Sequence, residues 1–305
     1  MSYVLIAEQG LNGLQFGLML FLLAAGLTLV FGIMDMINLA HGSLSMLGAF
    51  IAAALVQATG SFVAGVLLAI PATALAGMAL EVVLFRKLYQ RDHLSQVLAT
   101  FALILIFNEG VRLVWGSDAA LPMPQALSGP VELLPGLHYP AYRLLIIAVG
   151  LAVAIALFFL VQKTKMGMLV RAGASNREMA LAMGVDIKAV FTVVFGVGAA
   201  LCAVAGALLA PLLAVQVGMG ENILILAFVV IVIGGIGSVR GAFVGAVLVG
   251  IVDTIGRAFL PILFGAFLPP QFASAAGPAI ASVAIYVLMA VVLFLKPQGL
   301  FPARG

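Results

Sequence analysis

QKTKMGMLVRAGASNREMALAMGVDIK, residues 162–188, is the one extended polar stretch of this 305-residue chain. Long apolar runs lie on both sides of it, and such runs are typical of helices that cross a membrane. Its basic residues are Lys163, Lys165, Arg171, Arg177 and Lys188. Because short loops rich in lysine and arginine stay on the cytoplasmic side, we expect this stretch to be a cytoplasmic loop between two membrane helices.

A short helix is predicted within this loop. Ser175 and Glu178 have the spacing of a capping box, in which the serine oxygen accepts an early helix amide and the glutamate reaches back to the serine amide. The helix should therefore begin near Asn176. Gly184 favours a left-handed end about two turns later, and Asp186 is suited to cap the next helix, which continues into an apolar run.

The predicted helix has an apolar face with charges beside it. Helical spacing puts Met179, Ala180 and Met183 on one side, and Arg177 and Glu178 elsewhere. A helix of about two turns is only marginally stable alone in water, so it should dock into another surface. The alternative is an ordinary surface loop that joins two membrane helices, and the residues by themselves leave both interpretations open.

The composition makes lipid the main solvent of this chain. Hydrophobic residues are 65% of the sequence and charged residues only 8%, which is far from the composition of a soluble domain. The formal net charge of +3 includes 14 basic residues that lie in loops rather than in one patch or stripe. Nucleic-acid binding is therefore not supported.

Side chains for catalysis or for holding a cofactor are scarce. Cys202 is the only cysteine and lies in an apolar run, so neither a disulfide nor a thiolate metal site can form within one chain. His41, His93 and His138 fall in three different segments, and no GxxxxGK[ST] phosphate loop occurs. We therefore predict no catalytic residue, no cofactor, no metal site and no ATP hydrolysis by this chain.

Apolar windows long enough to span about 30 Å of hydrocarbon recur along the sequence. They cover residues 11–33, 37–56, 62–84, 94–115, 142–161, 189–213, 223–250 (extending to about 255) and 278–295. The seventh is too long for one straight span, and the turn Gly234–Gly241 should divide it into two shorter helices. The fold class that follows is all-α: a polytopic transmembrane helical bundle of eight to nine segments, some broken or re-entrant, in one domain over residues 1–305.

Basic residues in short loops also set the expected orientation. A second basic loop carries Arg86, Lys87 and Arg91. It belongs on the same side as residues 162–188, whereas residues 116–141 between them contain five prolines and no lysine or arginine, as expected of an external loop. Lys296 and Arg304 place the C-terminus in the cytoplasm, and nine crossings then place the N-terminus outside. A re-entrant segment at residues 37–56 would reverse the N-terminal side.

Small residues recur within the predicted spans. Gly241 and Gly245 have GxxxG spacing, and Ala199, Ala203 and Ala207 stand at every fourth position. Small residues let helix backbones approach closely in lipid, so a compact bundle is expected. A dimer interface at Gly241 and Gly245 is the alternative.

Ionisable residues at membrane depth are costly, so each of them should have a partner. Helical spacing pairs Asp253 with Arg257, and Glu109 with Arg112. Glu81 lies about one turn from Arg86 and Lys87 and is expected to form an interfacial pair with them.

Two breaks between apolar segments are candidates for a translocation pathway. Asn38, His41 and Gly42 mark the start of the second segment, where they either line a pathway or gate, or are a capping asparagine and an interfacial histidine. The break in the seventh window brings backbone to membrane depth, which is tolerated where it lines a cavity. Its glycines are Gly234, Gly235 and Gly237.

Several motifs, in order along nearly the whole chain, resemble the permease subunits of branched-chain amino acid ABC transporters, the LivH type. The opening signature is GLTLVFGIM at 26–34, followed by INLAHG at 37–42 and MLGA at 46–49. The similarity continues through LATF at 98–101, Arg171-Ala172, Met183-Gly184-Val185 and GGIGS at 234–238, with Gly241 and Gly245, and ends at KPQGLF, 296–301. One departure is Leu39, where the family usually has phenylalanine.

The resemblance implies an inner-membrane importer with several subunits. These are a second permease (LivM-like, or a second copy of this chain), two cytoplasmic ATPases and an external substrate-binding protein, with no nucleic acid. Residues 162–188 would be a cytoplasmic coupling loop whose short helix sits in a groove on the ATPase, so that ATP binding drives alternating access of the permeases. The implied coupling residues are Arg171, Ser175, Asn176, Arg177, Glu178, Met179, Ala180, Met183 and Gly184.

Other functions stay open at this point. An ion-gradient-driven secondary transporter is one, although charge relays within the helices, which such a protein should have, are not seen in the sequence. A passive channel or a scaffold is another. Relatives of the resembled family are expected to carry branched-chain amino acids, other amino acids, amides or urea. Because the external binding protein chiefly sets selectivity in such systems, no high-affinity site is expected in this chain alone.

Overall fold

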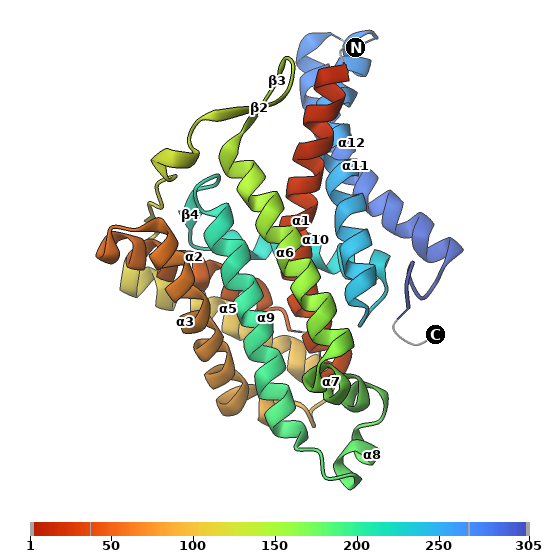
Figure 1. Ribbon diagram of the computed structural model, residues 1–305. Coiled ribbons are helices and arrows are strands. Elements are labelled where there is room, and N and C mark those ends of the chain that lie inside the picture. The colour runs from red at the N-terminus through yellow and green to blue at the C-terminus, as the bar shows by residue number, and fades with distance from the viewer. Residues whose placement is uncertain (1–2, 37, 268, 303–305) are drawn as a thin grey trace. The chain divides into compact units, whose positions relative to one another are not determined.

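The computed structural model describes residues 3–36, 38–267 and 269–302 (Figure 1). Two residues used in the predictions, Ile37 and Arg304, lie outside them. Within the described part, eight helices are long and apolar enough to cross a membrane, and one further apolar helix is shorter. The predicted all-α, polytopic bundle of eight to nine segments is therefore confirmed.

The long helices are α1 (Tyr3–Met34), α2 (His41–Thr59), α3 (Phe62–Leu80), α5 (His93–Trp115), α6 (Ala141–Lys163), α9 (Ile187–Leu209), α11 (Val239–Gly265) and α12 (Pro270–Leu295). The shorter ones are the π-helix η1 (Glu81–Phe85), α4 (Arg86–Leu88), the 3₁₀ helix η2 (Gln125–Leu127), α7 (Lys165–Ser175), α8 (Arg177–Ala182) and α10 (Met219–Gly234). The strands are β1 (Asp118–Ala119), β2 (Pro130–Leu134), β3 (Leu137–Pro140) and β4 (Val215–Gln216).

The structure divides the seventh predicted segment and lengthens the last one. The seventh window is divided as expected, into α10 and α11, and the 16 residues of α10 rise only about 24 Å, which is less than the hydrocarbon thickness. The last helix begins at Pro270, not at the predicted Pro278. Pro270 takes the first helical position, where its missing N–H costs nothing, while Pro278 lies inside the helix. A proline within a membrane helix is tolerated because neighbouring groups can satisfy the freed carbonyl.

The chain forms two compact units, each built from segments that are distant in sequence. The first unit contains residues 1–21, 124–152 and 228–305. The second unit contains residues 22–123 and 153–227. Helices α1, α6 and α10 each contribute residues to both units.

In the second unit, α2, α3 and α9 pack on one another through small residues. A Cβ added to Gly48 would lie 2.5 Å from the Cα of Ala203, and one added to Gly77 would lie 2.5 Å from the Cβ of Ala199. Such close backbone approach maximises dispersion contacts between helices in lipid, where no hydrophobic force draws them together. The compact bundle expected from the small residues is confirmed here.

Polar contacts are found at both ends of the second unit. At one end β1 pairs antiparallel with β4, and the amide of Asn108 donates to Glu221 Oε1 at 2.7 Å. Near that end, the predicted pair of Glu109 and Arg112 is confirmed at 2.7 Å. The basic loop after α3 and the loop of residues 162–188 lie together at the other end, because Arg86 donates a 2.8 Å hydrogen bond to Thr192 of α9.

In the first unit, α11 packs along α12 and is crossed by the N-terminal half of α1. A Cβ on Gly13 would lie 2.9 Å from the Cα of Ile251, so the backbones of α1 and α11 nearly touch. The predicted pair of Asp253 and Arg257 is confirmed, with Arg257 Nε 2.8 Å from Asp253 Oδ1. The antiparallel hairpin of β2 and β3 is joined to α1 by a 3.0 Å hydrogen bond from the Tyr139 hydroxyl to Asn12.

Gly241 and Gly245 serve contacts within the chain. A Cβ on Gly245 would lie 2.7 Å from the carbonyl oxygen of Val230, and one on Gly241 would overlap the backbone of Gly234. Both glycines are buried against α10. The alternative of a dimer interface at this GxxxG pair is therefore wrong, since the small surface is already covered by the neighbouring helix.

Candidate functional site: the loop of residues 162–188 and its short helix

Residues 162–188 contain two helices rather than the single one predicted. Helix α7 precedes the short helix, and its N-cap is Thr164, whose side chain accepts from the amide of Gly167 at 3.1 Å. Gly167 must be small, because a Cβ there would overlap the carbonyl groups at the end of α6. Threonine is a common N-cap residue, so Thr164 is the signal in the sequence that could have located α7. Arg171 of α7 donates back to the carbonyl oxygen of Val161.

The start of the short helix α8 corrects the prediction by one residue. Ser175 is the last residue of α7, and Asn176 is the N-cap, whose Oδ1 accepts from the Met179 amide at 2.9 Å. Asn176 has an extended backbone, with φ −153° and ψ 100°, and so it separates the two helices. The predicted capping box of Ser175 and Glu178 is therefore wrong. Asparagine caps as well as serine does, and Ser175 was already part of the preceding helix.

The end of α8 agrees with the prediction. Gly184 has φ +83°, its amide donates to the carbonyl of Leu181, and the amide of Val185 donates to the carbonyl of Ala180, each at 3.0 Å. This pair of hydrogen bonds is a Schellman motif, which satisfies carbonyl groups that a helix end otherwise leaves unpaired. Asp186 then caps α9 by accepting from the Ala189 amide at 3.1 Å, as predicted.

The apolar face of α8 differs in part from the expected one. Met179 and Met183 are 61% and 78% exposed, but Ala180 is buried and cannot belong to the exposed surface. Leu181 is exposed as well, but on another side of the helix, because residues two apart on a helix do not face each other. Ala180 therefore packs α8 onto the rest of its unit, while three large apolar side chains remain open to another molecule. We call Met179 and Met183, which lie about one turn apart, the exposed face of α8.

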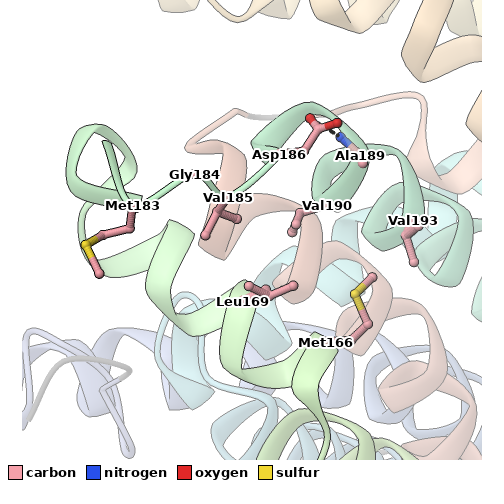
Figure 2. A pocket seen from close by; sticks show the side chains of 9 residues that line it. All are labelled: Met166, Leu169, Met183, Gly184, Val185, Asp186, Ala189, Val190 and Val193. Atoms are coloured by element: carbon pink, nitrogen blue, oxygen red, sulfur yellow. Dashed lines mark hydrogen bonds between the residues drawn. The ribbon is translucent and has the colours of Figure 1, made fainter. Parts of the chain in front are cut away.

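A pocket of about 360 Å³ lies next to this face (Figure 2). Its wall comes from α7, from the turn after α8 and from the first turns of α9. The lining residues are Met166, Leu169, Met183, Gly184, Val185, Asp186, Ala189, Val190 and Val193. The lining is largely apolar, and Met183 belongs to both the pocket and the exposed face. Together they offer a continuous apolar surface at the end of the second unit.

Arg177, the first residue of α8, is attached to the membrane helices. Its guanidinium lies 5.0 Å from the centre of the Phe191 ring of α9, which is the geometry of a cation–π interaction. Glu178 is exposed. Arg177 therefore fixes the N-terminal end of α8 to α9, in addition to any contact that it makes with a partner.

The first group of predicted pathway residues lies inside the second unit. Asn38 Oδ1 accepts from the Ala40 amide at 3.0 Å, so this asparagine orders the turn before α2. His41 is buried rather than interfacial, with Nε2 3.1 Å from Cys202 Sγ. A Cβ on Gly26 would lie 2.8 Å from that same nitrogen, and one on Gly42 would lie 2.3 Å from the carbonyl oxygen of Gly220. These residues therefore tie α1, α2 and α9 together.

The second group lies in the first unit, at the turn between α10 and α11. Gly234 packs against Gly241, while Gly235 and Gly237 have φ +108° and +81°. The C-terminal segment covers this turn, because the amide of Phe301 donates to the carbonyl of Gly234 at 2.9 Å. Close packing and positive φ thus explain all three predicted glycines structurally. A role for them in translocation stays a prediction.

Comparisons with known proteins agree with the motifs. A family model described as branched-chain amino acid transport system, permease component, matches residues 10–294. The chain is 29% identical to the high-affinity branched-chain amino acid transport system permease protein LivH of Escherichia coli K12, with 85% of this chain and 88% of that protein aligned. Its identity to BraD of Pseudomonas aeruginosa, which has the same description, is 30%, with 82% and 85% aligned.

A more distant relative is the probable branched-chain amino acid transport permease protein LivH of Methanocaldococcus jannaschii, at 26% identity, with 81% of this chain and 80% of that protein aligned. No solved structure matches the chain. The family model covers almost all of the sequence, including both helix breaks and the loop of residues 162–188. The chain belongs to the family of permease components of the branched-chain amino acid transport system.

Proposed function

We propose that this chain is the transmembrane permease of an ATP-driven importer for branched-chain amino acids, and that α8 is the element that couples it to a cytoplasmic ATPase. The substrate class is taken from the printed names of the relatives. The chain itself would form the pathway and would not act as an enzyme. It would work in the inner membrane with a second permease, two ATPase subunits and an external binding protein.

The observation that carries the coupling role is the exposed face of α8. α8 has only six residues and lies in a loop rich in basic residues, yet large apolar side chains are exposed on it. Exposed apolar side chains that lie together are unfavourable in water and mark surfaces that bind another protein. Both ends of α8 are capped within the chain, so the helix is presented ready-formed. A preformed helix loses less conformational freedom on docking, which favours binding.

The positions of the basic loops support a cytoplasmic location for α8. The loop after α3 and the loop of residues 162–188 were expected on the same side of the membrane from their charges alone. The hydrogen bond from Arg86 to Thr192 brings these two loops to the same end of the second unit. On this proposal the C-terminus is also cytoplasmic and the N-terminus external.

The test is assembly with the ATPase. Met183→Asp places a charge on the exposed face, and we expect the permease to lose co-purification with the ATPase and ATP-driven leucine uptake in reconstituted vesicles. The matched control is Leu134→Asp, an exposed leucine of β2 on the predicted external side, which should retain both. Retained co-purification and uptake in Met183→Asp would refute the coupling role. Leucine uptake by the wild-type chain alone, driven by an ion gradient, would refute the importer assignment.

A further inference from the structure

Glu81 is a fully buried carboxylate where α3 approaches the end of its membrane span. It begins the five-residue π-helix η1, in which the amide of Arg86 donates to the Glu81 carbonyl. π-Helical turns are rare and occur frequently at functional sites. An ionisable side chain buried within a membrane segment is likewise costly to keep. The π-helix and the buried carboxylate thus occur together at Glu81, which makes this residue a candidate for a functional role.

Three side chains satisfy the Glu81 carboxylate. The Tyr89 hydroxyl donates to Oε1 at 2.9 Å, and the Thr192 hydroxyl donates to Oε2 at 2.6 Å. The guanidinium of Arg86 lies 3.4 Å from Glu81 and donates to Thr192 as well. Burial first, and the neighbouring Glu81 charge second, raise the pKa of Tyr89 above its usual range. The hydroxyl proton of Tyr89 is thus kept for the hydrogen bond to Glu81.

Aromatic rings extend this cluster from α3 to α8. The Tyr89 ring meets Phe191 of α9 edge to face, with ring centres 5.2 Å apart, and the Arg177 guanidinium lies over Phe191. One helical turn away, Phe85 packs on Phe195 with ring centres 4.9 Å apart. The two ring pairs show that the segment from η1 through α4 and the start of α9 run antiparallel in close contact.

Tyr89 also reaches the end of α1, because its hydroxyl lies 3.5 Å from the sulfur of Met34. Side chains on a helix lean toward its N-terminus, which explains how Tyr89 can reach back to Glu81. The cluster therefore joins the ends of α1, α3 and α9 to the first residue of α8. Each of these groups lies within the second unit.

We propose that Glu81 is a positioning residue that transmits movement of α8 to α3 and α1 through Tyr89, Phe191 and Arg177. The proposal rests on the coupling role of α8 proposed for this chain. When a bound ATPase displaces α8, the Arg177 side chain carries Phe191 and α9 with it. The hydrogen bonds of Glu81 then require α3 to follow, because separating them would leave a carboxylate buried without its donors. The π-helix gives α3 a point at which it can adjust its hydrogen bonding.

The experiment uses the full complex in vesicles and measures the ratio of ATP hydrolysis with loaded binding protein to hydrolysis without it. Glu81→Gln keeps the shape of the side chain but replaces one acceptor oxygen by a donor, and should lower this ratio by about threefold or more. The matched control is Glu109→Gln, which removes an exposed carboxylate paired with Arg112 and should leave the ratio unchanged.

Phe191→Leu is a second variant that interrupts the same contacts at another residue, because Phe191 touches both Tyr89 and Arg177. It should also lower the ratio, and the double variant Glu81→Gln with Phe191→Leu should lose no more than the worse single variant, because both interrupt one linkage. If Glu81→Gln fails to reach the membrane, the test rests on Phe191→Leu alone. An unchanged ratio of ATP hydrolysis in Phe191→Leu then overturns the proposal. An unchanged ratio in Glu81→Gln, or losses that multiply in the double variant, also overturns it.

The two proposals fail differently in this experiment. If the wild-type complex shows no stimulation by loaded binding protein, the importer assignment fails, and the role of Glu81 fails with it. If the wild type is stimulated and Glu81→Gln is stimulated equally, α8 can still be the coupling helix. Only the linkage through Glu81 is then wrong.

Discussion

Gly184→Ala is the sharpest single test of the short helix α8. Gly184 has φ +83°, and apart from its neighbours in the chain no residue lies within 4 Å of the place where a Cβ would stand. The substitution therefore introduces no clash, and its cost comes from the backbone alone. A residue other than glycine pays roughly 1–2 kcal/mol in the left-handed region. That cost falls on the Schellman motif whose two hydrogen bonds close α8.

The consequence for coupling can be worked out from that cost. A free-energy change of about 1–2 kcal/mol lowers the equilibrium constant for the capped helix roughly fivefold to thirtyfold. Because a helix of two turns is marginal even when it is capped, most molecules should then present an unwound α8. We expect stimulation of ATP hydrolysis by loaded binding protein to fall by a similar factor, about fivefold or more. Gly184→Pro should be worse still, since it also removes the amide that donates to Leu181.

Gly60→Ala is the control that separates coupling from general loss of stability. Gly60 ends α2 with φ +68°, also has open space around it, and donates from its amide to the carbonyl of Val56 at 2.9 Å. Its replacement should therefore cost about as much as that of Gly184 but leave stimulated ATP hydrolysis intact. Equal losses of stimulation in Gly60→Ala and Gly184→Ala, measured at equal amounts of folded complex, would refute the reasoning.

Two further predictions concern packing within each unit. Gly206→Ala should destabilise the protein by about 2 kcal/mol, because the new Cβ would overlap the carbonyl of Ser45 and force α2 away from α9. The thermal midpoint in detergent should fall, whereas Gly110→Ala, with open space in a helix interior, should not lower it. Arg257→Met should cost about 1 kcal/mol, since it strands the buried Asp253 carboxylate while the arginine itself is half-exposed. An unchanged midpoint would contradict that pairing.

Local signals in the sequence were sufficient where the structure depends on neighbours along the chain. Gly184 and Asp186 were correctly identified, because a helix end needs a left-handed residue and the next helix needs a side-chain acceptor at fixed offsets. The pair of Asp253 and Arg257 was found for the same reason, one helical turn apart. Each of these features is decided within about four residues.

Predictions failed where packing with distant residues decides the outcome. The spacing favours Ser175 as the cap, but the helix that Thr164 caps runs as far as Ser175, and the length of that helix is not fixed by the local pattern. Ala180 was placed on the exposed face by helical spacing, but spacing does not tell which side of a helix faces its own protein. The apolar pattern does not predict that α10 covers Gly241 and Gly245, because that contact depends on how the turn between α10 and α11 folds.

At Glu81 the sequence predicts one partner of the carboxylate and misses another. A carboxylate at the end of an apolar window predicts a partner, and Arg86 was identified correctly. Thr192 is 111 residues away, and nothing in the local pattern points to it. The exposed fraction of Arg86, 34%, against none for Glu81, means that solvent screens the ion pair only on the arginine side. The neutral donors Tyr89 and Thr192 make the shorter contacts with the carboxylate, 2.9 and 2.6 Å against 3.4 Å for Arg86.

The structure also explains why α8 should be short. Its anchors are Ala180, which is buried, and Arg177, which lies over Phe191, and both belong to one side of the helix. A longer helix would add contacts to its own unit and would depend less on its caps. Six residues leave a helix that depends on its two caps, with the exposed face of Met179 and Met183 open to a partner. Elements that move during function belong to the less stable parts of a protein. On the proposed coupling role, a marginal helix that is fixed to α9 at one end would move with an ATPase without unfolding the bundle.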